Sequence, residues 1–286
     1  MALIKPDFVL LLSCVDRKGL VAAIANSIAS QDCNIVQNSQ FGDAATGRFF
    51  MRISFAAPDD VTVESFSEAF MPVATAYNLD WKVHDLKVKQ RAIIMVSKGG
   101  HCLNDLLYRT ATSYLPMTVT SIVSNHLTWK RRADHEDIPY YHLPVTPDTK
   151  AEQEARLLEL IDEQKADLVI LARYMQVLSD DLCRKLEGRA INIHHSFLPG
   201  FKGARPYHRA YDRGVKMVGA TAHYVTADLD EGPIIAQDVS IVDHADTVDD
   251  LIAQGQESES RVLTRAVKAH CEHRVMLNNL RTVVFK

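Results

Sequence analysis

The sequence lacks the features that mark nucleic-acid-binding and membrane proteins. Its 286 residues carry 32 basic and 36 acidic side chains, a formal net charge of −4, so no basic excess favours DNA, RNA or anionic lipid. The apolar run near the N-terminus breaks at Ser13 and is too short to span a membrane. The charged stretch "DRKG" follows where a signal-peptide cleavage site would be expected. These absences predict a soluble, cytoplasmic protein with no nucleic-acid or membrane partner.

Cysteine is scarce and shows no pattern. The five cysteines are Cys14, Cys33, Cys102, Cys183 and Cys271. They form no CxxC pair, which argues against a zinc cage, and their odd number indicates a reducing compartment. No convergent set of His, Cys and Asp ligands stands out, so no metal site is predicted. Cys102 has no acid–base partner nearby in the sequence, which argues against a nucleophilic thiol.

Residues 1–86 alternate strand and helix. Four segments have the length and apolar character of strands: residues 8–15, 34–41, 48–55 and 79–86. Between them, apolar residues at helical spacing run from Leu20 to Ile28 and from Phe66 to Tyr77. Asp16, in the turn before the first helix, is predicted to cap it. The order β-α-β-β-α-β predicts a ferredoxin-like domain.

A charged linker at residues 87–91 leads into a different pattern over residues 92–286. The apolar strands "IIMV", "VTSIVS", "ADLVILA" and "RAINIH" alternate here with helical stretches. This alternation predicts a Rossmann-like, doubly wound and mostly parallel sheet, so the fold class is α/β. The rest is predicted to form an antiparallel pair, a long helix and a hairpin, at residues 217–242, 248–271 and 274–285.

Polar residues end two of these strands. Asn192 and His194 lie two apart at a strand end, so their side chains share one face, and Asp230 lies in the loop "TADLDEGP" after another strand. Ligands of open α/β sheets bind at such ends. An amide and an imidazole can stabilise an oxyanion while a carboxylate orients water. Alternatively, these residues only hydrogen-bond loop backbone and form a solvated turn; the pattern alone supports both interpretations equally.

Two stretches, "INIHHSFLPGFKGARP" and "GATAHYVTADLDEGPIIAQ", resemble the folate-dependent formyltransferase family. The family's mark is Asn-x-His-x-Ser-x-Leu-Pro followed by an Asp in a Leu-Asp-x-Gly-Pro-type loop. The matching positions are Asn192, His194, Ser196, Leu198, Pro199 and Asp230. The resemblance covers the chain from about Ala92 onward and implies a formyltransferase fold.

The first 86 residues, with Asp16 and Gly19 at their first strand-to-helix turn, resemble an ACT domain, an amino-acid-sensing module. An ACT-like module ahead of a formyltransferase-like domain resembles the formyltetrahydrofolate deformylase family over nearly the whole chain. The resemblance implies hydrolysis of 10-formyltetrahydrofolate, at a linear amide C–N bond, to tetrahydrofolate and formate that feeds purine synthesis. Folate is then the substrate, and no cofactor is expected.

The resemblance also implies roles for single residues. Asn192 and a protonated His194 would stabilise the oxyanion, and Asp230 would keep the imidazole charged and position the water. Asp16 and Gly19 would bind an amino-acid effector, with glycine and methionine the first candidates, or the module would only join subunits. A homo-oligomer, in the form of a tetramer, is expected. The residues implied to wall the folate are Met175, Val177, Leu178, Thr226, Ala227, Asp228 and Leu229.

The folate wall and two neighbouring motifs have competing interpretations. Met175 and Leu178 are, taken alone, typical of ordinary core. The turn "SKGGHCLNDLL" looks like a phosphate-cradling turn but lacks both GxGxxG and the Walker pattern. In the related glycinamide ribonucleotide transformylase this turn holds the substrate phosphate with small residues and Asn, whereas here Lys98, His101 and Cys102 intrude, which argues against a phosphate role. His101 and Asn104 are instead expected to cap the following helix, and Ser196, outside a GxSxG context, to be a turn residue.

Two other functions remain open beside the hydrolase. A transferase would pass the same formyl group to an amine such as glycinamide ribonucleotide, and the same three polar residues would serve it. A non-catalytic sensor would bind folate and an amino acid without turnover. The altered glycine turn and the additional N-terminal module favour water as the acceptor.

Overall fold

The computed structural model describes residues 5–199 and 206–286. Two compact units make up the chain. The first runs to Lys89 and includes Glu272–Met276 and Val283–Lys286, and the second comprises Gln90–Cys271 and Leu277–Thr282. The sequence-based division placed everything from residue 92 to residue 286 in the second domain, whereas two short C-terminal segments belong to the first unit. Neither described range contains a helix with the length and apolar character needed to cross a membrane.

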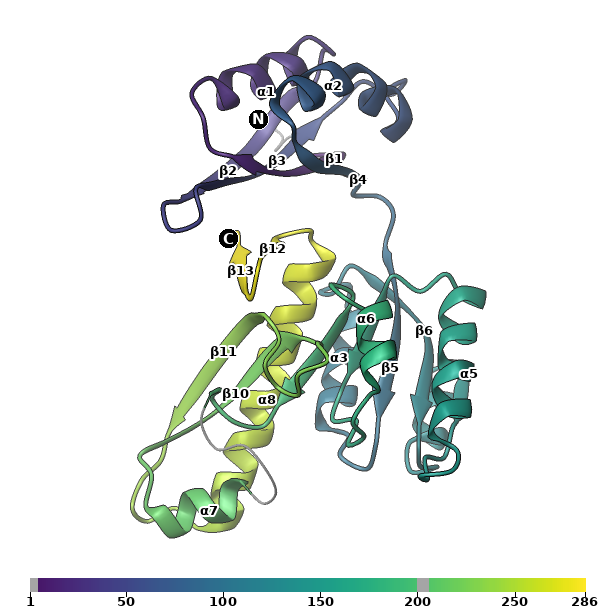
Figure 1. Ribbon diagram of the computed structural model, residues 1–286. Coiled ribbons are helices and arrows are strands. Elements are labelled where there is room, and N and C mark those ends of the chain that lie inside the picture. Colours follow the sequence, from purple (N-terminus) through teal and green to yellow (C-terminus); the bar gives the residue numbers. More distant parts are fainter. Residues whose placement is uncertain (1–4, 200–205) are drawn as a thin grey trace. The chain divides into compact units, whose positions relative to one another are not determined.

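The first unit is a four-stranded antiparallel sheet with two helices on one face (Figure 1). Its elements are β1 (Phe8–Val15), α1 (Leu20–Ala29), β2 (Asn34–Asp43), β3 (Arg48–Ala56), α2 (Val63–Tyr77) and β4 (Asp80–Asp85). The strand order β2-β3-β1-β4 confirms the ferredoxin-like prediction. On β3, Phe49, Met51, Ile53 and Phe55 alternate toward the helices and are buried in one core, as the period of a strand requires.

The ends of the helices in this unit differ from the prediction at one place. The assignment of Asp16 as the cap of α1 is wrong, because the helix starts only at Leu20. Gly19 precedes it with φ 91° and no side-chain cap is present; glycine takes this left-handed conformation without steric cost. By contrast, Thr62 and Ser65 form a reciprocal capping box at the start of α2.

A C-terminal segment is attached to the first unit through Arg52. The guanidinium donates to the carbonyl oxygens of His273 at 2.9 Å and of Glu272 at 3.1 Å, and the rings of His84 and His273 stack with centroids 3.7 Å apart. The predicted C-terminal hairpin is present as β12 (Val275–Asn278) and β13 (Arg281–Val284).

The second unit is built on a seven-stranded sheet of order β11-β10-β9-β8-β5-β6-β7. The strands are β5 (Gln90–Val96), β6 (Met117–Ser124), β7 (Tyr140–His142), β8 (Leu168–Leu171), β9 (Ala190–His194), β10 (Met217–Tyr224) and β11 (Ile234–Ile241). Strands β5 to β9 pair in parallel, and β10 runs antiparallel to both β9 and β11. This confirms the doubly wound, mostly parallel sheet and its antiparallel edge.

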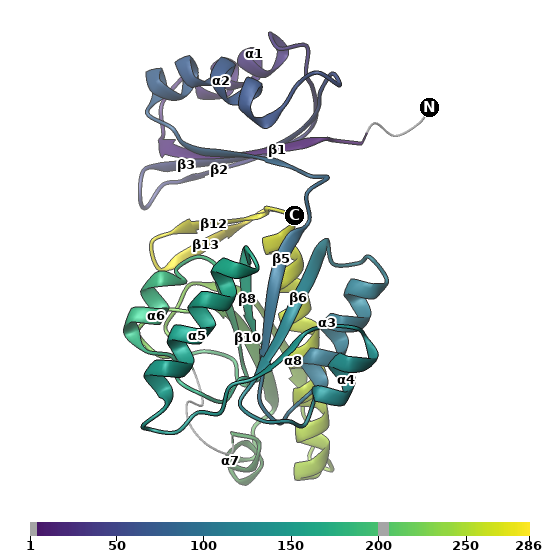
Figure 2. The same cartoon turned by 90° about the vertical axis from the view of Figure 1, so that its right-hand side faces the viewer.

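Helices cover both faces of this sheet (Figure 2). They are α3 (His101–Ala111), α4 (Lys130–His135), α5 (Lys150–Glu163), α6 (Asp180–Lys185), α7 (Pro206–Arg213) and α8 (Val248–Cys271). Ile93 and Met95 of β5 pack with α5 and α6 in one core, while Ile94 between them is also fully buried. A strand buried on both faces has a continuous apolar sequence, which explains the run "AIIMV".

Candidate active site

The pairing of β9 with β10 places four polar side chains on one face of the sheet. Asn192 lies opposite His223, and His194 lies opposite Thr221. Asn192 Nδ2 is 3.3 Å from His223 Nε2. His223 Nδ1 lies 2.8 Å from the carbonyl oxygen of Tyr224, so Nδ1 carries the proton and Nε2 accepts from the amide. This contact orients Asn192 with its donor group toward the site.

The loop after β10 brings Asp230 to the same place. Asp230 Oδ1 is 3.2 Å from His194 Nδ1 and 3.7 Å from His223 Nε2. Asp230 has φ 59°, a strained conformation for a residue other than glycine. Gly232 is required because a Cβ there would lie 1.8 Å from the carbonyl oxygen of Tyr224. The Asp-x-Gly spacing of the motif thus follows from how closely this loop approaches the end of β10.

Electrostatics keep Asp230 ionised. Burial disfavours its charge, but the hydrogen bond from His194 Nδ1 and the charge of His194 outweigh burial and hold the pKa of the Asp230 carboxyl well below its usual range. A carboxylate of this kind accepts a hydrogen bond from His194 Nδ1 and so directs Nε2 away from itself. His194 Nε2 is buried and has no hydrogen-bond partner among the described residues. One ring nitrogen of His194 is therefore available to a ligand.

A cavity of about 500 Å³ opens beside these groups, and Asn192, His194 and Asp230 all line it. Six of the seven residues predicted to wall a folate line it too: Met175, Val177, Leu178, Thr226, Ala227 and Leu229. Met175, Val177 and Leu229 are 59%, 57% and 60% exposed, more than core residues of these types. Leu178 lines the cavity and is also buried in the core with α5 and α6, so it is both a core residue and a cavity residue.

Asp228 does not line the cavity. It is exposed, and its carbonyl oxygen accepts hydrogen bonds from Thr226 Oγ1 at 3.0 Å and from the amide of Glu231 at 3.2 Å. Asp228 therefore closes the turn that carries Asp230. Its predicted role in folate binding has no geometric support.

The turn after β9 is held by the neighbouring strands. Thr221 Oγ1 donates to the carbonyl oxygen of Ser196 at 2.9 Å and accepts from the amide of Leu198 at 3.0 Å. Gln237 Nε2 donates to the carbonyl oxygen of Leu198 at 3.1 Å, and the Leu198–Pro199 bond is cis. Ser196 lies in this turn as predicted. Residues 200–205 of the motif lie outside the described residues.

Sequence reasoning missed two groups at this site. His223 was read only as part of a strand, although a histidine two residues from Thr221 in an otherwise apolar strand marks a polar face. Arg173 follows β8 with φ 64°. Its Nη1 lies 3.0 Å from His195 Nδ1 and its Nε lies 3.1 Å from Glu259 Oε2. Glu259 is on α8, and no local pattern in the sequence connects it to β8.

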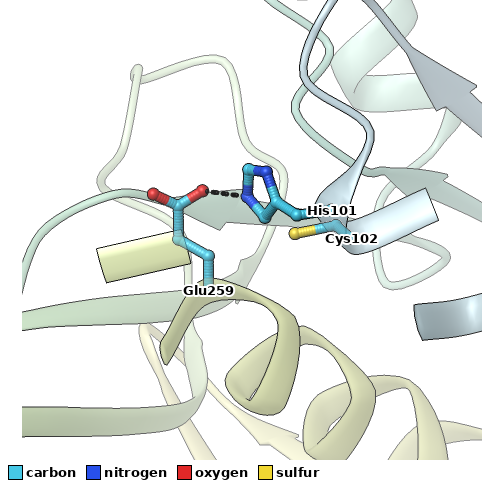
Figure 3. A group of neighbouring side chains, drawn as sticks. All are labelled: His101, Cys102 and Glu259. Carbon is cyan, nitrogen blue, oxygen red and sulfur yellow. Dashed lines mark hydrogen bonds and ion pairs between the residues drawn. The ribbon is translucent and has the colours of Figure 1, made fainter. Parts of the chain in front are cut away.

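The prediction that His101 and Asn104 cap the helix after the glycine turn is wrong, because α3 has no side-chain cap. His101 is the first residue of α3 but does not cap it; its Nε2 lies 2.8 Å from Glu259 Oε2 (Figure 3). Ligand atoms of His101, Cys102 and Glu259 lie within 4.8 Å of one another. Burial raises the pKa of the Cys102 thiol well above its usual value, and the Arg173 guanidinium already neutralises the carboxylate. These features fit a buried ion-pair network better than a cation site.

The predicted effector residues lie at one turn of the first unit. A Cβ on Gly42 would be 3.2 Å from Asp16 Oδ2, and one on Gly19 would be 3.4 Å from the hydroxyl of Tyr77. Arg17 donates to the carbonyl oxygen of Ala76 and lies over the Tyr77 ring at 4.2 Å. The turn is therefore tied to the end of α2. Its binding of an effector stays a prediction.

Comparison with known proteins identifies the second unit and then the whole chain. The "Formyl transferase" family model matches residues 90–267. A formyltetrahydrofolate deformylase of Corynebacterium sp. (strain P-1) is 48% identical, covering 97% of this chain and 98% of that protein. The crystal structure of a formyltetrahydrofolate deformylase from Pseudomonas syringae pv. tomato str. DC3000 superposes with a TM-score of 0.95 at 43% identity, covering 98% and 94% of the two chains.

A second kind of relative matches a smaller share of the chain. Glycinamide ribonucleotide transformylase 1 from Symbiobacterium toebii superposes with a TM-score of 0.65 at 30% identity and covers 69% of this chain and 95% of its own. The full-length matches are thus to deformylases, whereas the transformylase match is partial. The chain belongs to the formyl transferase family and, within it, to the formyltetrahydrofolate deformylases.

Proposed function

We propose that this enzyme hydrolyses 10-formyltetrahydrofolate to tetrahydrofolate and formate at the cavity beside β9 and β10. The observation that carries the assignment of the site is the convergence of Asn192, His194 and Asp230 on one cavity. His194 Nε2 has no hydrogen-bond partner among the described residues there. Near full-length similarity to deformylases supports the choice of reaction.

In the proposed mechanism the folate lies against Met175, Val177 and Leu229, and its formyl oxygen points toward Asn192 and His194. The Asn192 amide and a protonated His194 donate hydrogen bonds to this oxygen, which becomes an oxyanion when water adds to the formyl carbon. Asp230 holds His194 by its Nδ1 and takes part in moving the proton of the attacking water to N10. The C–N10 bond then breaks, and formate and tetrahydrofolate leave.

Incubation of the purified enzyme with 10-formyltetrahydrofolate, with and without glycinamide ribonucleotide, tests this proposal. Formate equal to tetrahydrofolate without acceptor is expected. Turnover that depends on the acceptor would instead establish a transferase. The absence of turnover under both conditions would indicate a non-catalytic sensor that binds folate.

We also propose that the first unit is an ACT domain that senses an amino acid at Asp16 and Gly19. The helix start beyond Gly19 suits a carboxylate, and Asp16 suits an ammonium group. Glycine or methionine should change hydrolysis through a coupling of about 1–3 kcal/mol. Hydrolysis rates of the intact enzyme and of Asp16→Ala across both amino acids provide the test. An unchanged response in Asp16→Ala would exclude this site.

The setting of the enzyme is part of the same proposal. We place it in the cytoplasm as a homo-oligomer of four subunits, where the formate it releases supplies purine synthesis. The reduced state of cysteines in such a compartment agrees with five buried cysteine thiols. Sedimentation equilibrium of the purified enzyme would test the subunit number.

A further inference from the structure

The topology of the second unit predicts a ligand crevice between β5 and β8. From β5 the chain proceeds to β6 and β7 on one side of the sheet, while β8 and β9 continue on the other side. Ligands of open α/β sheets bind outside the carboxyl ends of strands at such a switch point. In this enzyme the loops that follow β5 and β8 are joined by hydrogen bonds at that point. The amide of Ser97 donates to the carbonyl oxygen of Arg173 at 3.2 Å, and the amide of Met175 donates to Ser97 Oγ at 2.9 Å.

An indole covers the glycine turn next to this point. A Cβ on Gly100 would lie 1.9 Å from the ring of Trp129, whose Nε1 donates to the carbonyl oxygen of Lys98 at 3.2 Å. The close approach of Trp129 is therefore the reason for glycine here. The turn is occupied by the protein's own side chain, where an anion-binding turn would leave its backbone amides open to a ligand.

The side chain of Arg173 extends this filling toward the reacting groups. Its Nη1 contacts His195, whose ring stacks on His194 with centroids 4.5 Å apart. Arg173 also lines the catalytic cavity. His195 thus lies between the guanidinium of Arg173 and the imidazole of His194, which faces the formyl oxygen in the proposed mechanism.

A buried carboxylate holds Arg173 in this position. Glu259 is 1% exposed and is contacted by Arg173 at 3.1 Å, His101 at 2.8 Å and Tyr207 at 2.7 Å. Burial disfavours its charge, but these three partners outweigh burial and keep the pKa of Glu259 below its ordinary value. Because an ionised, fully paired carboxylate in the interior loses much when one partner leaves, Arg173 is held firmly.

We propose that Arg173, anchored by Glu259, closes the side of the catalytic cavity that it lines to amines, so that water is the nucleophile that reaches the formyl carbon. The inference rests on the proposed hydrolysis. A relative named as a glycinamide ribonucleotide transformylase shares this fold, so the fold itself does not exclude a second substrate. The hydrogen-bonded loops of this chain, with Arg173 and Trp129 packed at the switch point, would exclude one. A fixed cation also repels amines that are protonated at neutral pH.

Removal of the side chain should let a small amine compete with water. Hydroxylamine is a suitable probe because its nitrogen attacks the formyl carbon as water does. A new C–N bond to hydroxylamine forms, the C–N10 bond breaks and the proton lost by hydroxylamine goes to N10. The products are formohydroxamate and tetrahydrofolate, and no oxidant or reductant is required. Glycinamide serves as a larger probe of the same kind.

The key variant is Arg173→Gly, since glycine relieves the left-handed backbone at φ 64°. The measured quantity is the ratio of formylated amine to formate, which a general loss of activity leaves unchanged. The wild-type enzyme should give formate equal to tetrahydrofolate at every hydroxylamine concentration. Arg173→Gly should raise the ratio by about 10-fold or more above the uncatalysed background. Arg184→Ala, which removes an exposed arginine of α6, should behave as wild type.

Glu259→Gln provides a second variant because it keeps the volume and removes the charge that holds Arg173. Glu259→Gln should raise the ratio of formylated amine to formate less than Arg173→Gly does. Arg173→Lys, which keeps a positive charge at this position, should give a ratio close to that of the wild-type enzyme. If Arg173→Gly does not fold, as judged by its thermal unfolding, Glu259→Gln decides. The inference is overturned if every folded variant gives formate equal to tetrahydrofolate whatever the amine concentration. A wild-type enzyme that forms no formate would instead refute the proposed hydrolysis.

Discussion

Replacement of Asn192 by alanine isolates the proposed oxyanion site. One N–H of its amide is directed to His223 Nε2 at 3.3 Å, which leaves the other for the formyl oxygen. His194 Nε2 supplies the second donor. Loss of one of two such donors costs about 2.7–4 kcal/mol in the transition state, so kcat should fall by about 10²–10³. KM should change little, because the residues that wall the folate are untouched.

Steady-state kinetics with 10-formyltetrahydrofolate, followed by the formation of tetrahydrofolate, measures both parameters. Asn192→Asp keeps the shape of the side chain but has no donor, and its kcat should fall at least as far as that of Asn192→Ala. Asn26→Ala, on the exposed side of α1 in the other unit, is the matched control. An unchanged kcat with a raised KM would show that Asn192 binds the ground state alone and would refute the role given to it.

Three further predictions concern Asp230, Gly232 and His270. Because the pKa of Asp230 is lowered in the folded enzyme, its charge stabilises the fold above about pH 4 and this stability is lost as the pH falls. Urea unfolding should thus show Asp230→Asn weaker than wild type at pH 7 with a gap that closes in acid. Gly232→Ala should cost about 1–3 kcal/mol in the same assay and lower kcat, since its Cβ would displace the Asp230 loop; wild-type kcat would contradict this. Burial lowers the pKa of His270 from 6.5 to about 4, so between these pH values the unfolded chain binds more protons than the folded enzyme. The free energy of unfolding should therefore decrease by up to about 3 kcal/mol as the pH is lowered from 6.5 to 4, and His270→Gln should make this decrease smaller.

The order of strands and helices could be predicted because each depends on local periodicity. The run "AIIMV" in β5 indicates burial on two faces, which the structure confirms. The alternation in β3 indicates the face that packs on the helices, whereas the burial of its other face, at Phe50, Arg52 and Ser54, could not be read from it. Asp16 was misassigned because aspartate is a common cap, whereas the turn before α1 uses a left-handed Gly19 that needs no side chain. The choice between the two depends on backbone conformation, which sequence spacing does not reveal.

The candidate site was predictable as far as its motif extends. Asn192 and His194 share a strand face by period, and Asp230 lies where a neighbouring strand ends; the structure brings all three to one cavity. Arg173 and Glu259 were beyond reach because their contact joins α8 to the end of β8 through side chains alone. Their identification required the packed structure.

The most direct test of the account is the origin of the oxygen in the product. The enzyme is given 10-formyltetrahydrofolate in water enriched in ¹⁸O, without any amine acceptor, and the formate is analysed by mass spectrometry. Direct attack of water on the formyl carbon predicts one solvent oxygen in each formate and an equal amount of tetrahydrofolate. Formate without solvent oxygen, or no formate until an amine is added, would contradict the proposed hydrolysis.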